Sequence, residues 1–115
     1  MLQRAALGVD QGQVVLFSDF EDGGPMWAGE GPRQHRQPVR FSRRFRGPPV
    51  VHVALAMWDV AGGHNSRLDI SAEDIGPRSF TLLFRTWGDT RVARVRASWL
   101  AIGELPAADD WEIED

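Results

Sequence analysis

The chain has 115 residues, of which 43% are hydrophobic and 25% are charged, and its formal net charge is −3. This length suits one domain, and the acidic balance argues against general nucleic-acid binding, which requires a basic surface. The sequence contains no cysteine, so disulfides and thiolate sites are excluded, and stability must come from packing, to which oligomerisation can add.

Six segments alternate apolar and polar residues with a period of two, which is typical of half-buried β-strands. In chain order they are residues 12–20, 38–45, 50–60, 67–75, 79–87 and 91–103. The clearest is 79–87, in which Phe80, Leu82 and Phe84 share one face. Frequent turn sequences separate the segments, and none carries an amphipathic helical pattern. We therefore predict an all-β, six-stranded antiparallel β-sandwich within residues 1–103, followed by an acidic C-terminal tail at 104–115.

Arginine is the only basic residue type, and six arginines without an acid lie between residues 33 and 46. In the strand expected at 38–45, alternation places Arg43 between two phenylalanines on the buried face. Because a lone buried charge is costly, Arg43 must be paired, lie at a subunit interface or sit at an irregularity in the strand. On the opposite face, Arg40, Arg44 and Arg46 form either an ordinary exposed surface or an anion-binding surface for acidic polysaccharides or lipid headgroups. The preceding residues 27–38 look like a long surface loop.

No pattern for catalysis or metal binding stands out. The three histidines, His35, His52 and His64, lie outside any His-Glu-x-x-His motif, and no serine lies in a nucleophile elbow. Asp69 and Glu73 are spaced as a glycosidase pair could be, but solvent-facing positions on a strand account for them. We expect a protein that is not an enzyme and that uses no metal and no cofactor.

The sequence shows no pattern typical of membrane insertion or of export by a signal peptide. No apolar run is long enough to span a bilayer, so we expect no membrane insertion. The N-terminal stretch MLQRAALGVD lacks an apolar segment with a cleavage site, so we expect no signal peptide. The localisation stays open, since an extracellular or particle-associated protein would then need a non-classical route.

The stretch RTWGDT, residues 85–90, places Trp87 where an expected strand meets a Gly-Asp turn. Large aromatic side chains usually enter the core. The loops of a sandwich gather at its ends, which would bring His64, Asn65 and Arg67 close to this turn. An exposed ring beside amide and guanidinium groups suits a sugar, because the ring can cover pyranose C–H groups while the donors bind hydroxyls. The alternative is that Trp87 folds back over the core as a lid.

The stretches VRFSRRFRGPPVVHVALAMWDV, NSRLDI and FTLLFRTWGDTRVARVRASWLAIG together resemble the H-type lectin domain family, the group of snail agglutinin and the C-terminal domain of discoidin. The resemblance extends over about residues 8–103. It implies a six-stranded antiparallel β-sandwich and a homotrimer with sugar sites near the junctions between protomers. It also implies binding of galactose-type sugars, especially N-acetylgalactosamine, without catalysis and without a metal.

The resemblance assigns sugar-binding roles to residues in the expected loops. They are Trp87 as the stacking face, Arg67 and Asn65 as donors, and Glu30 and Gly29 as the acid and glycine of the loop before the second strand. Asp22 is an alternative for the acid. Gly88 stands where snail agglutinin has a histidine, and Ala93 replaces an aromatic residue, so the resemblance implies a loss of contact surface at both positions.

The sequence therefore predicts a trimeric, non-catalytic module that binds galactose-type glycans, a function that suits cell adhesion or virion attachment. The alternative, favoured by Gly88 and Ala93, is a structural, decoration or spike module in a larger particle assembly, either a virion or a secreted particle. Its sugar site would then be degraded or altered. A third hypothesis is recognition of acidic polymers by the arginine-rich strand.

Overall fold

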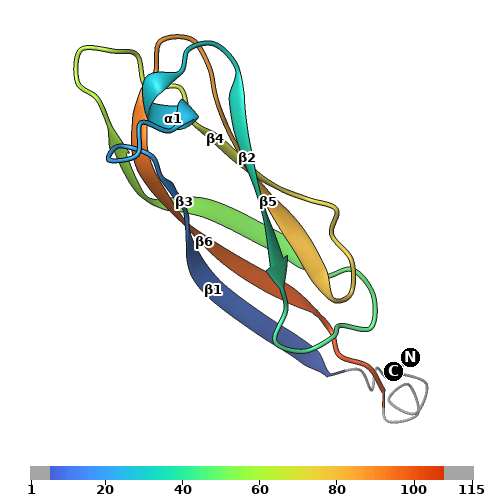
Figure 1. The fold of residues 1–115 in the computed structure, drawn as a ribbon. Coiled ribbons are helices and arrows are strands. Elements are labelled where there is room, and N and C mark those ends of the chain that lie inside the picture. The colour runs from blue at the N-terminus through green and yellow to red at the C-terminus, as the bar shows by residue number, and fades with distance from the viewer. Residues whose placement is uncertain (1–5, 108–115) are drawn as a thin grey trace.

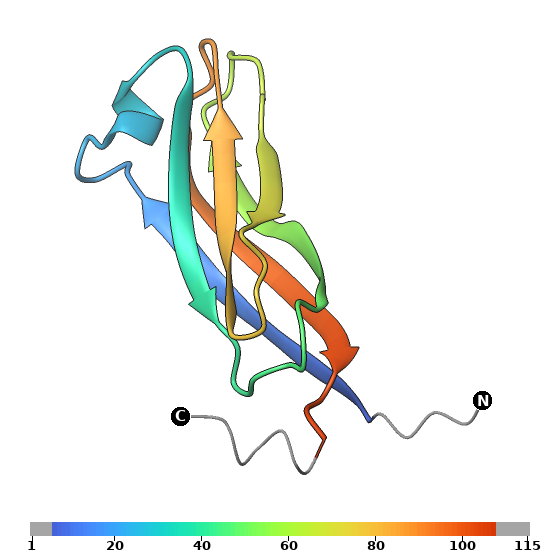
Figure 2. The ribbon, with the colours of Figure 1, turned by 90° about the vertical axis from the view of Figure 1, so that its right-hand side faces the viewer.

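The computed structural model describes residues 6–107, which form two antiparallel β-sheets packed face to face (Figure 1). The strands are β1 (Leu7–Ser18), β2 (Arg33–Arg40), β3 (Val50–Val60), β4 (Asp69–Glu73), β5 (Ser79–Thr86) and β6 (Val92–Glu104), and one helical turn, α1 (Pro25–Ala28), precedes β2. One sheet has the order β1-β6-β3 and the other the order β2-β5-β4, and Figure 2 shows the second sheet in front of the first. The predicted six-stranded antiparallel β-sandwich is confirmed.

The core lies between the two sheets and follows the alternation of the sequence. Phe80, Leu82 and Phe84 of β5 are each exposed by 1% or less, and Val95 and Ala97 of β6 are fully buried. Burying an apolar side chain of this size stabilises the fold by about 1.5–3 kcal/mol relative to leaving it in water. The two central strands, β5 and β6, therefore anchor the two sheets to each other.

The second strand lies earlier than predicted. It covers Arg33–Arg40, so the interpretations of residues 27–38 as a surface loop and of 38–45 as a strand are wrong. The apolar positions that suggested a strand at 38–45 are Phe41 and Phe45, which are buried although the segment that carries them is not a strand. Their rings lie 5.1 Å apart and close one end of the core, in an irregular segment that follows β2. Arg43 lies exposed in this segment, which matches the irregularity named among its three alternatives.

The loops that matter for function gather at the end of the sandwich farthest from the start of β1 (Figure 1, Figure 2). They are the β3–β4 loop (61–68), the β5–β6 loop (87–91) and the long β1–β2 connection (19–32), which contains α1. In that connection, the Asp19 carboxylate accepts a hydrogen bond from the Met26 amide at 3.0 Å, and the Met26 side chain is buried. The connection is thus fixed to the sandwich at α1.

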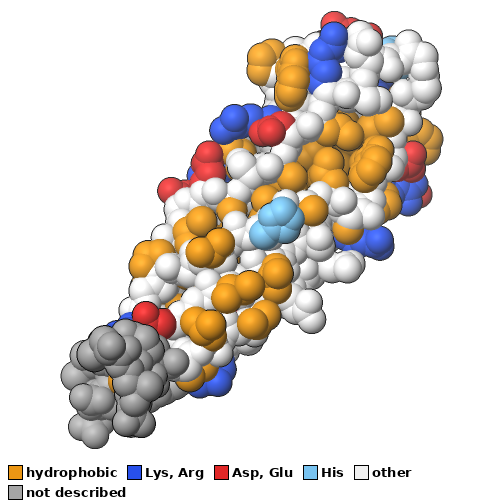
Figure 3. Space-filling view, turned by 180° about the vertical axis from the view of Figure 1, so that it is seen from behind, with side chains coloured by type: hydrophobic (Ala, Val, Ile, Leu, Met, Phe, Trp, Pro, Cys, Tyr) orange, Lys and Arg blue, Asp and Glu red, His pale blue; other side chains and the backbone are white. Residues whose placement is uncertain are grey.

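The outer face of the β1-β6-β3 sheet exposes a row of aliphatic side chains. Val9 of β1 and Val50 of β3 both pair in register with Ile102 of β6, and the three are 66%, 75% and 41% exposed. Figure 3, seen from the side of β3 and β4, shows hydrophobic side chains along much of the molecule, with charged ones mainly at the margins. The solvated face of an antiparallel sheet is usually polar, so this exposed aliphatic row is unusual for such a face.

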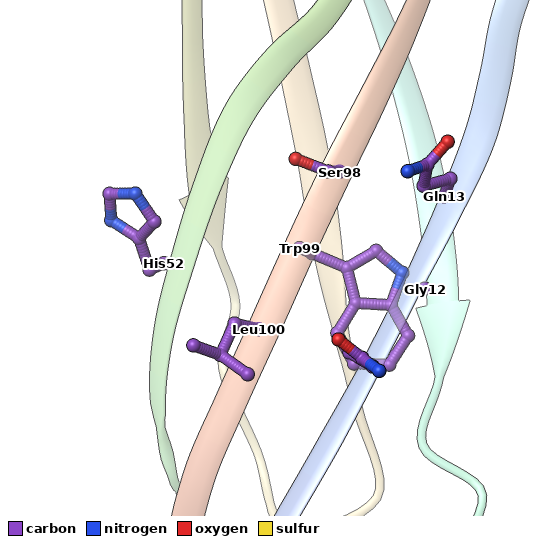
Figure 4. A pocket seen from close by; sticks show the side chains of 7 residues that line it. Gly12, Gln13, His52, Ser98, Trp99 and Leu100 are labelled. Carbon is purple, nitrogen blue, oxygen red and sulfur yellow. The ribbon is translucent and has the colours of Figure 1, made fainter.

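A more polar hollow of about 470 Å³ lies next to the aliphatic row (Figure 4). It is lined by Gln11, Gly12, Gln13, His52, Ser98, Trp99 and Leu100. Gly12 is required here, because a Cβ atom at this position would lie only 2.8 Å from Nε1 of Trp99. The missing side chain on β1 lets the indole of β6 lie beside the neighbouring strand, as Figure 4 shows.

Candidate functional site

Trp87 stands at the tip of the sandwich, directly after β5, with 44% of its surface exposed. Trp87 is neither among the core side chains nor among those packed against the core, which argues against the alternative of a lid. The next residue, Gly88, has φ +70°, and a Cβ atom there would lie 2.9 Å from Nη1 of Arg67. Glycine is favoured by this left-handed conformation, in which any residue with a Cβ atom is strained. Its presence thus has a reason in the local structure, and is not only a loss of contact surface as the sequence suggested.

Asp89 holds the polar side chains of the β3–β4 loop beside this turn. Its Oδ1 accepts a hydrogen bond from Arg67 Nη1 at 2.8 Å, and its Oδ2 lies 3.6 Å from His64 Nδ1. The Asn65 amide lies against the same guanidinium. With its oxygen turned to Arg67 it accepts from both Nη atoms at 3.2 and 3.3 Å, whereas the opposite orientation gives only a 3.5 Å contact to Asp89, so the former fits better. The proximity expected for the two loops is confirmed.

The electrostatic state of Asp89 follows from these contacts. Desolvation on its own would raise the pKa of Asp89, but the hydrogen bond from Arg67, a backbone hydrogen bond and the positive charge of Arg67 outweigh it. The pKa therefore lies below its ordinary value. Asp89 stays ionised at neutral pH and keeps the Arg67 guanidinium in place.

Two buried threonines fix the backbone around Arg67. The Thr90 hydroxyl accepts from the Arg67 amide at 3.0 Å and donates to the Asn65 carbonyl, while the Thr86 hydroxyl donates to the Arg67 carbonyl at 2.6 Å. Both threonine side chains are at most 1% exposed. Because buried hydrogen bonds of this kind are costly to lose, the short segment that carries Asn65 and Arg67 has one well-defined position.

Arg33, the first residue of β2, joins the remaining loops. Its guanidinium donates hydrogen bonds only to backbone carbonyls. The acceptors belong to Pro25 (3.4 Å), Met26 (3.1 Å), Gly31 (2.9 Å), Gly88 (3.3 Å) and Thr90 (2.8 Å). Burial lowers the pKa of Arg33, and the negative charge of Glu30 acts in the opposite direction. An arginine remains charged under such a shift, so one cation connects α1, the loop before β2 and the Trp87 turn.

The loop before β2 also contacts the Trp87 turn through its backbone, since the Gly31 amide donates to the Gly88 carbonyl at 3.0 Å. Gly29 ends α1, and a Cβ atom there would lie 2.5 Å from the Pro25 carbonyl oxygen. Glu30 is exposed. The structure thus brings the segment of Gly29 and Glu30 to the same end as Trp87.

Two further positions considered from the sequence differ in exposure. Asp22 lies in the exposed turn between β1 and α1. Ala93 of β6 is only 3% exposed, so it offers no surface to a ligand on this protomer. The sequence also gave no role to Asp89, which looked like a turn residue, or to Arg33, whose acceptors lie up to 57 residues away.

A model of the H-type lectin domain matches residues 36–102, which is more than half of the chain. The chain belongs to the H-type lectin domain family. This lectin-like domain is 56% identical, over 110 residues, to a protein of Fuscovulum blasticum named ATP synthase subunits region ORF 7, and the match covers 96% of each chain.

The solved structures similar to this H-type lectin domain include discoidin II of Dictyostelium discoideum. The native recombinant form has a TM-score of 0.75 at 23% identity, covering 87% of this chain and 38% of that chain. The wild-type form has a TM-score of 0.76 at 22% identity, covering 90% and 40%. The domain thus spans about two fifths of the length of discoidin II, and the likeness is one of fold.

Between residues 6 and 107, no three His, Asp or Glu side chains are grouped closely enough to hold a metal ion. Over the same residues, no helix is long and apolar enough to cross a membrane. The loop cluster around Trp87 is the candidate functional site because it sets an exposed aromatic ring in the same loops as the fixed guanidinium of Arg67 and the amide of Asn65.

Proposed function

We propose that the chain is a non-catalytic carbohydrate-binding module for galactose-type sugars, including N-acetylgalactosamine. The observation that carries this proposal is the half-exposed ring of Trp87 beside the fixed side chains of Arg67 and Asn65. The ring would cover the apolar C–H face of a pyranose, and the guanidinium and amide would bind its hydroxyls. Glu30 and Gly29 would complete the site from the loop before β2.

We also propose that the domain acts as a homotrimer, as the family resemblance implies. The support is the aliphatic row of Val9, Ile102 and Val50, since such a surface is stabilised when it is covered by other copies. Shallow sugar sites are weak one at a time. A trimer presents several of them on one particle, which raises the avidity for a glycan-coated surface.

An assembly or decoration module of a virion or other particle is the second candidate. Its support is the same aliphatic row, which serves assembly whether or not a sugar binds. Gly88 no longer favours it, because the left-handed backbone at this position is itself a reason for glycine.

Trp87→Ala is expected to weaken binding to galactose-type glycans by at least about 30-fold, as loss of a central aromatic contact costs on the order of 2 kcal/mol. The melting temperature should change little, because the ring is 44% exposed. A glycan array at two salt concentrations, with calorimetry on the best glycan, measures this. Phe20→Ala is the matched control, since Phe20 is an exposed aromatic residue (51%) of the same end of the sandwich whose ring packs against Trp27 and has no assigned part in the sugar site.

Other results on the array would select the other candidates. Salt-sensitive binding to acidic glycans that ignores Trp87→Ala would move the function to the arginines of residues 33–46. If the folded protein bound no glycan on the array, the assembly or decoration module would remain as the candidate function. Equal weakening by Phe20→Ala and Trp87→Ala would contradict the proposed site.

Sugar affinity is expected to stay level as the pH falls from 8 to about 5 and to drop only below about pH 4, the ordinary range of an aspartate. The pKa of Asp89 is lowered in the folded protein, so the carboxylate stays ionised and bound to Arg67 at any pH above the ordinary aspartate range. The interaction is lost only when the pH falls through the lowered pKa and the carboxylate becomes protonated. Calorimetric titrations with His64→Gln would isolate Asp89 from its imidazole neighbour. Asp89→Asn should bind weakly at every pH, and an unchanged affinity in that variant would refute the role of the carboxylate.

A further inference from the structure

A pocket of about 290 Å³ opens beside Trp87, where β2 begins and β5 ends. It is lined by Pro32, Arg33, Gln34, Arg85, Thr86 and Trp87. Gln34 and Arg85 lie directly opposite each other in the β2–β5 register, and both are exposed. Trp87 therefore borders this pocket and also belongs to the turn that Arg67 contacts through Asp89.

The polar groups of the pocket differ in what they can offer a ligand. The Thr86 hydroxyl already donates to the Arg67 carbonyl, and the Arg33 guanidinium is occupied by backbone carbonyls. The Gln34 amide and the Arg85 guanidinium remain to bind a ligand, while Pro32 and Trp87 supply apolar walls. A sugar residue requires hydrogen-bond donors and acceptors for its hydroxyls and apolar surfaces for its C–H groups. The amide supplies a donor and an acceptor, the guanidinium supplies further donors, and the two rings supply the apolar surfaces.

The charges around the pocket favour an uncharged ligand. Arg85 Nη2 lies 3.4 Å from Glu73 Oε2, and Arg85 faces Asp69 across the β4–β5 pair. These two carboxylates balance the guanidinium and reduce its attraction for an anion. The pocket therefore offers directional hydrogen bonds without a strong positive field.

We propose that this pocket binds a second, uncharged sugar residue that is linked to the one held at Trp87 and Arg67. The domain then recognises at least a disaccharide, and Gln34 and Arg85 determine which one. This inference rests on the proposed function, because it extends the same site.

The test compares N-acetylgalactosamine with a panel of uncharged disaccharides that contain it, by isothermal titration calorimetry. The wild-type protein is expected to bind the best disaccharide about tenfold more tightly than the monosaccharide, the effect of one or two net hydrogen bonds. Combining Gln34→Ala with Arg85→Gln should abolish this gain and leave the monosaccharide affinity within about twofold. Arg36→Gln is the matched control, because Arg36 also contacts Glu73, at 3.4 Å, but does not line the pocket.

Several outcomes would overturn the inference while the proposed function stands. They are a disaccharide gain that survives the double variant, an equal loss for monosaccharide and disaccharide, and no gain for any disaccharide. If the affinity increased only for sulfated or sialylated sugars, and the increase disappeared at high salt, the ligand of the pocket would be anionic and the inference would be wrong. Failure to bind either sugar, by contrast, would refute the proposed function itself, and the pocket proposal with it.

Discussion

Replacement of Arg33 by methionine is expected to lower the free energy of unfolding by about 3 kcal/mol and the melting temperature by roughly 10 °C. The guanidinium donates to five backbone carbonyls from three separate segments. Hydrogen bonds to a charged group contribute more than neutral ones, and methionine would leave acceptors such as the Thr90 carbonyl without a donor. Thermal and urea unfolding followed by circular dichroism measure the change.

Arg91→Met is the matched control for this prediction. Arg91 donates one hydrogen bond to the Trp27 carbonyl at 2.9 Å and lies over the Trp27 ring at 5.1 Å, so it is fixed at the same end of the sandwich. It does not join the loop of Gly31 to the Trp87 turn, and its loss should cost only about 1 kcal/mol. Arg33→Lys should fall between the two, because a lysine keeps the charge but not the planar fork. Equal stability of Arg33→Met and the wild type would contradict the argument.

The same variant connects stability with the proposed function. At temperatures where Arg33→Met is still folded, the loop of Glu30 should no longer be held beside Gly88. Sugar affinity should then fall even though Arg33 has no role as a direct sugar ligand. Calorimetry with N-acetylgalactosamine, on protein shown to be folded, checks this expectation.

Sequence patterns located most strands because their alternation reflects burial on one face. The alternation is strongest in β5 and β6, both central strands, although Leu83 interrupts it in β5 because it is also buried. The sequence of β2, RQHRQPVR, has few apolar residues, so its alternation gives little signal. Its position is set by pairing with β5, from Arg33 opposite Thr86 to Arg40 opposite Ser79, and such non-local pairing cannot be read from a local pattern.

The candidate site was predictable only in part. Trp87, Arg67 and Asn65 could be brought together because hairpin loops meet at the ends of a sandwich. The contributions of Arg33 and Gly88 could not be predicted, since one depends on carbonyl groups distant in sequence and the other on a contact with a guanidinium. Glycine in a turn sequence indicates conformational freedom, but not which side chain fills the space that it leaves.

Ile102→Asp is expected to convert the proposed trimer into a monomer. Ile102 is the centre of the aliphatic row, paired in register with Val9 and Val50. Covering that row with other copies would bury an unpaired carboxylate from each protomer, at a cost of several kcal/mol per charge. The protomer itself should stay folded, because the side chain is 41% exposed in it. Sedimentation velocity at micromolar concentration measures the mass.

Phe20→Asp is the control for this change, since Phe20 is 51% exposed in the β1–β2 connection, away from the aliphatic row. It should leave the trimer intact. A wild-type protein that sediments as a monomer, or an Ile102→Asp variant that remains a trimer, would refute the assignment of this face.

The monomeric variant would also locate the sugar site. Binding to a glycan-coated surface should fall by about 10²–10⁴-fold, because avidity is lost with the neighbouring sites. If the affinity for a free sugar in solution is unchanged, Trp87, Arg67 and Asn65 form a complete site within one protomer. If that affinity falls as well, a neighbouring protomer contributes to each site, as the resemblance to the family implies, and assembly would then be a condition for binding even a single sugar.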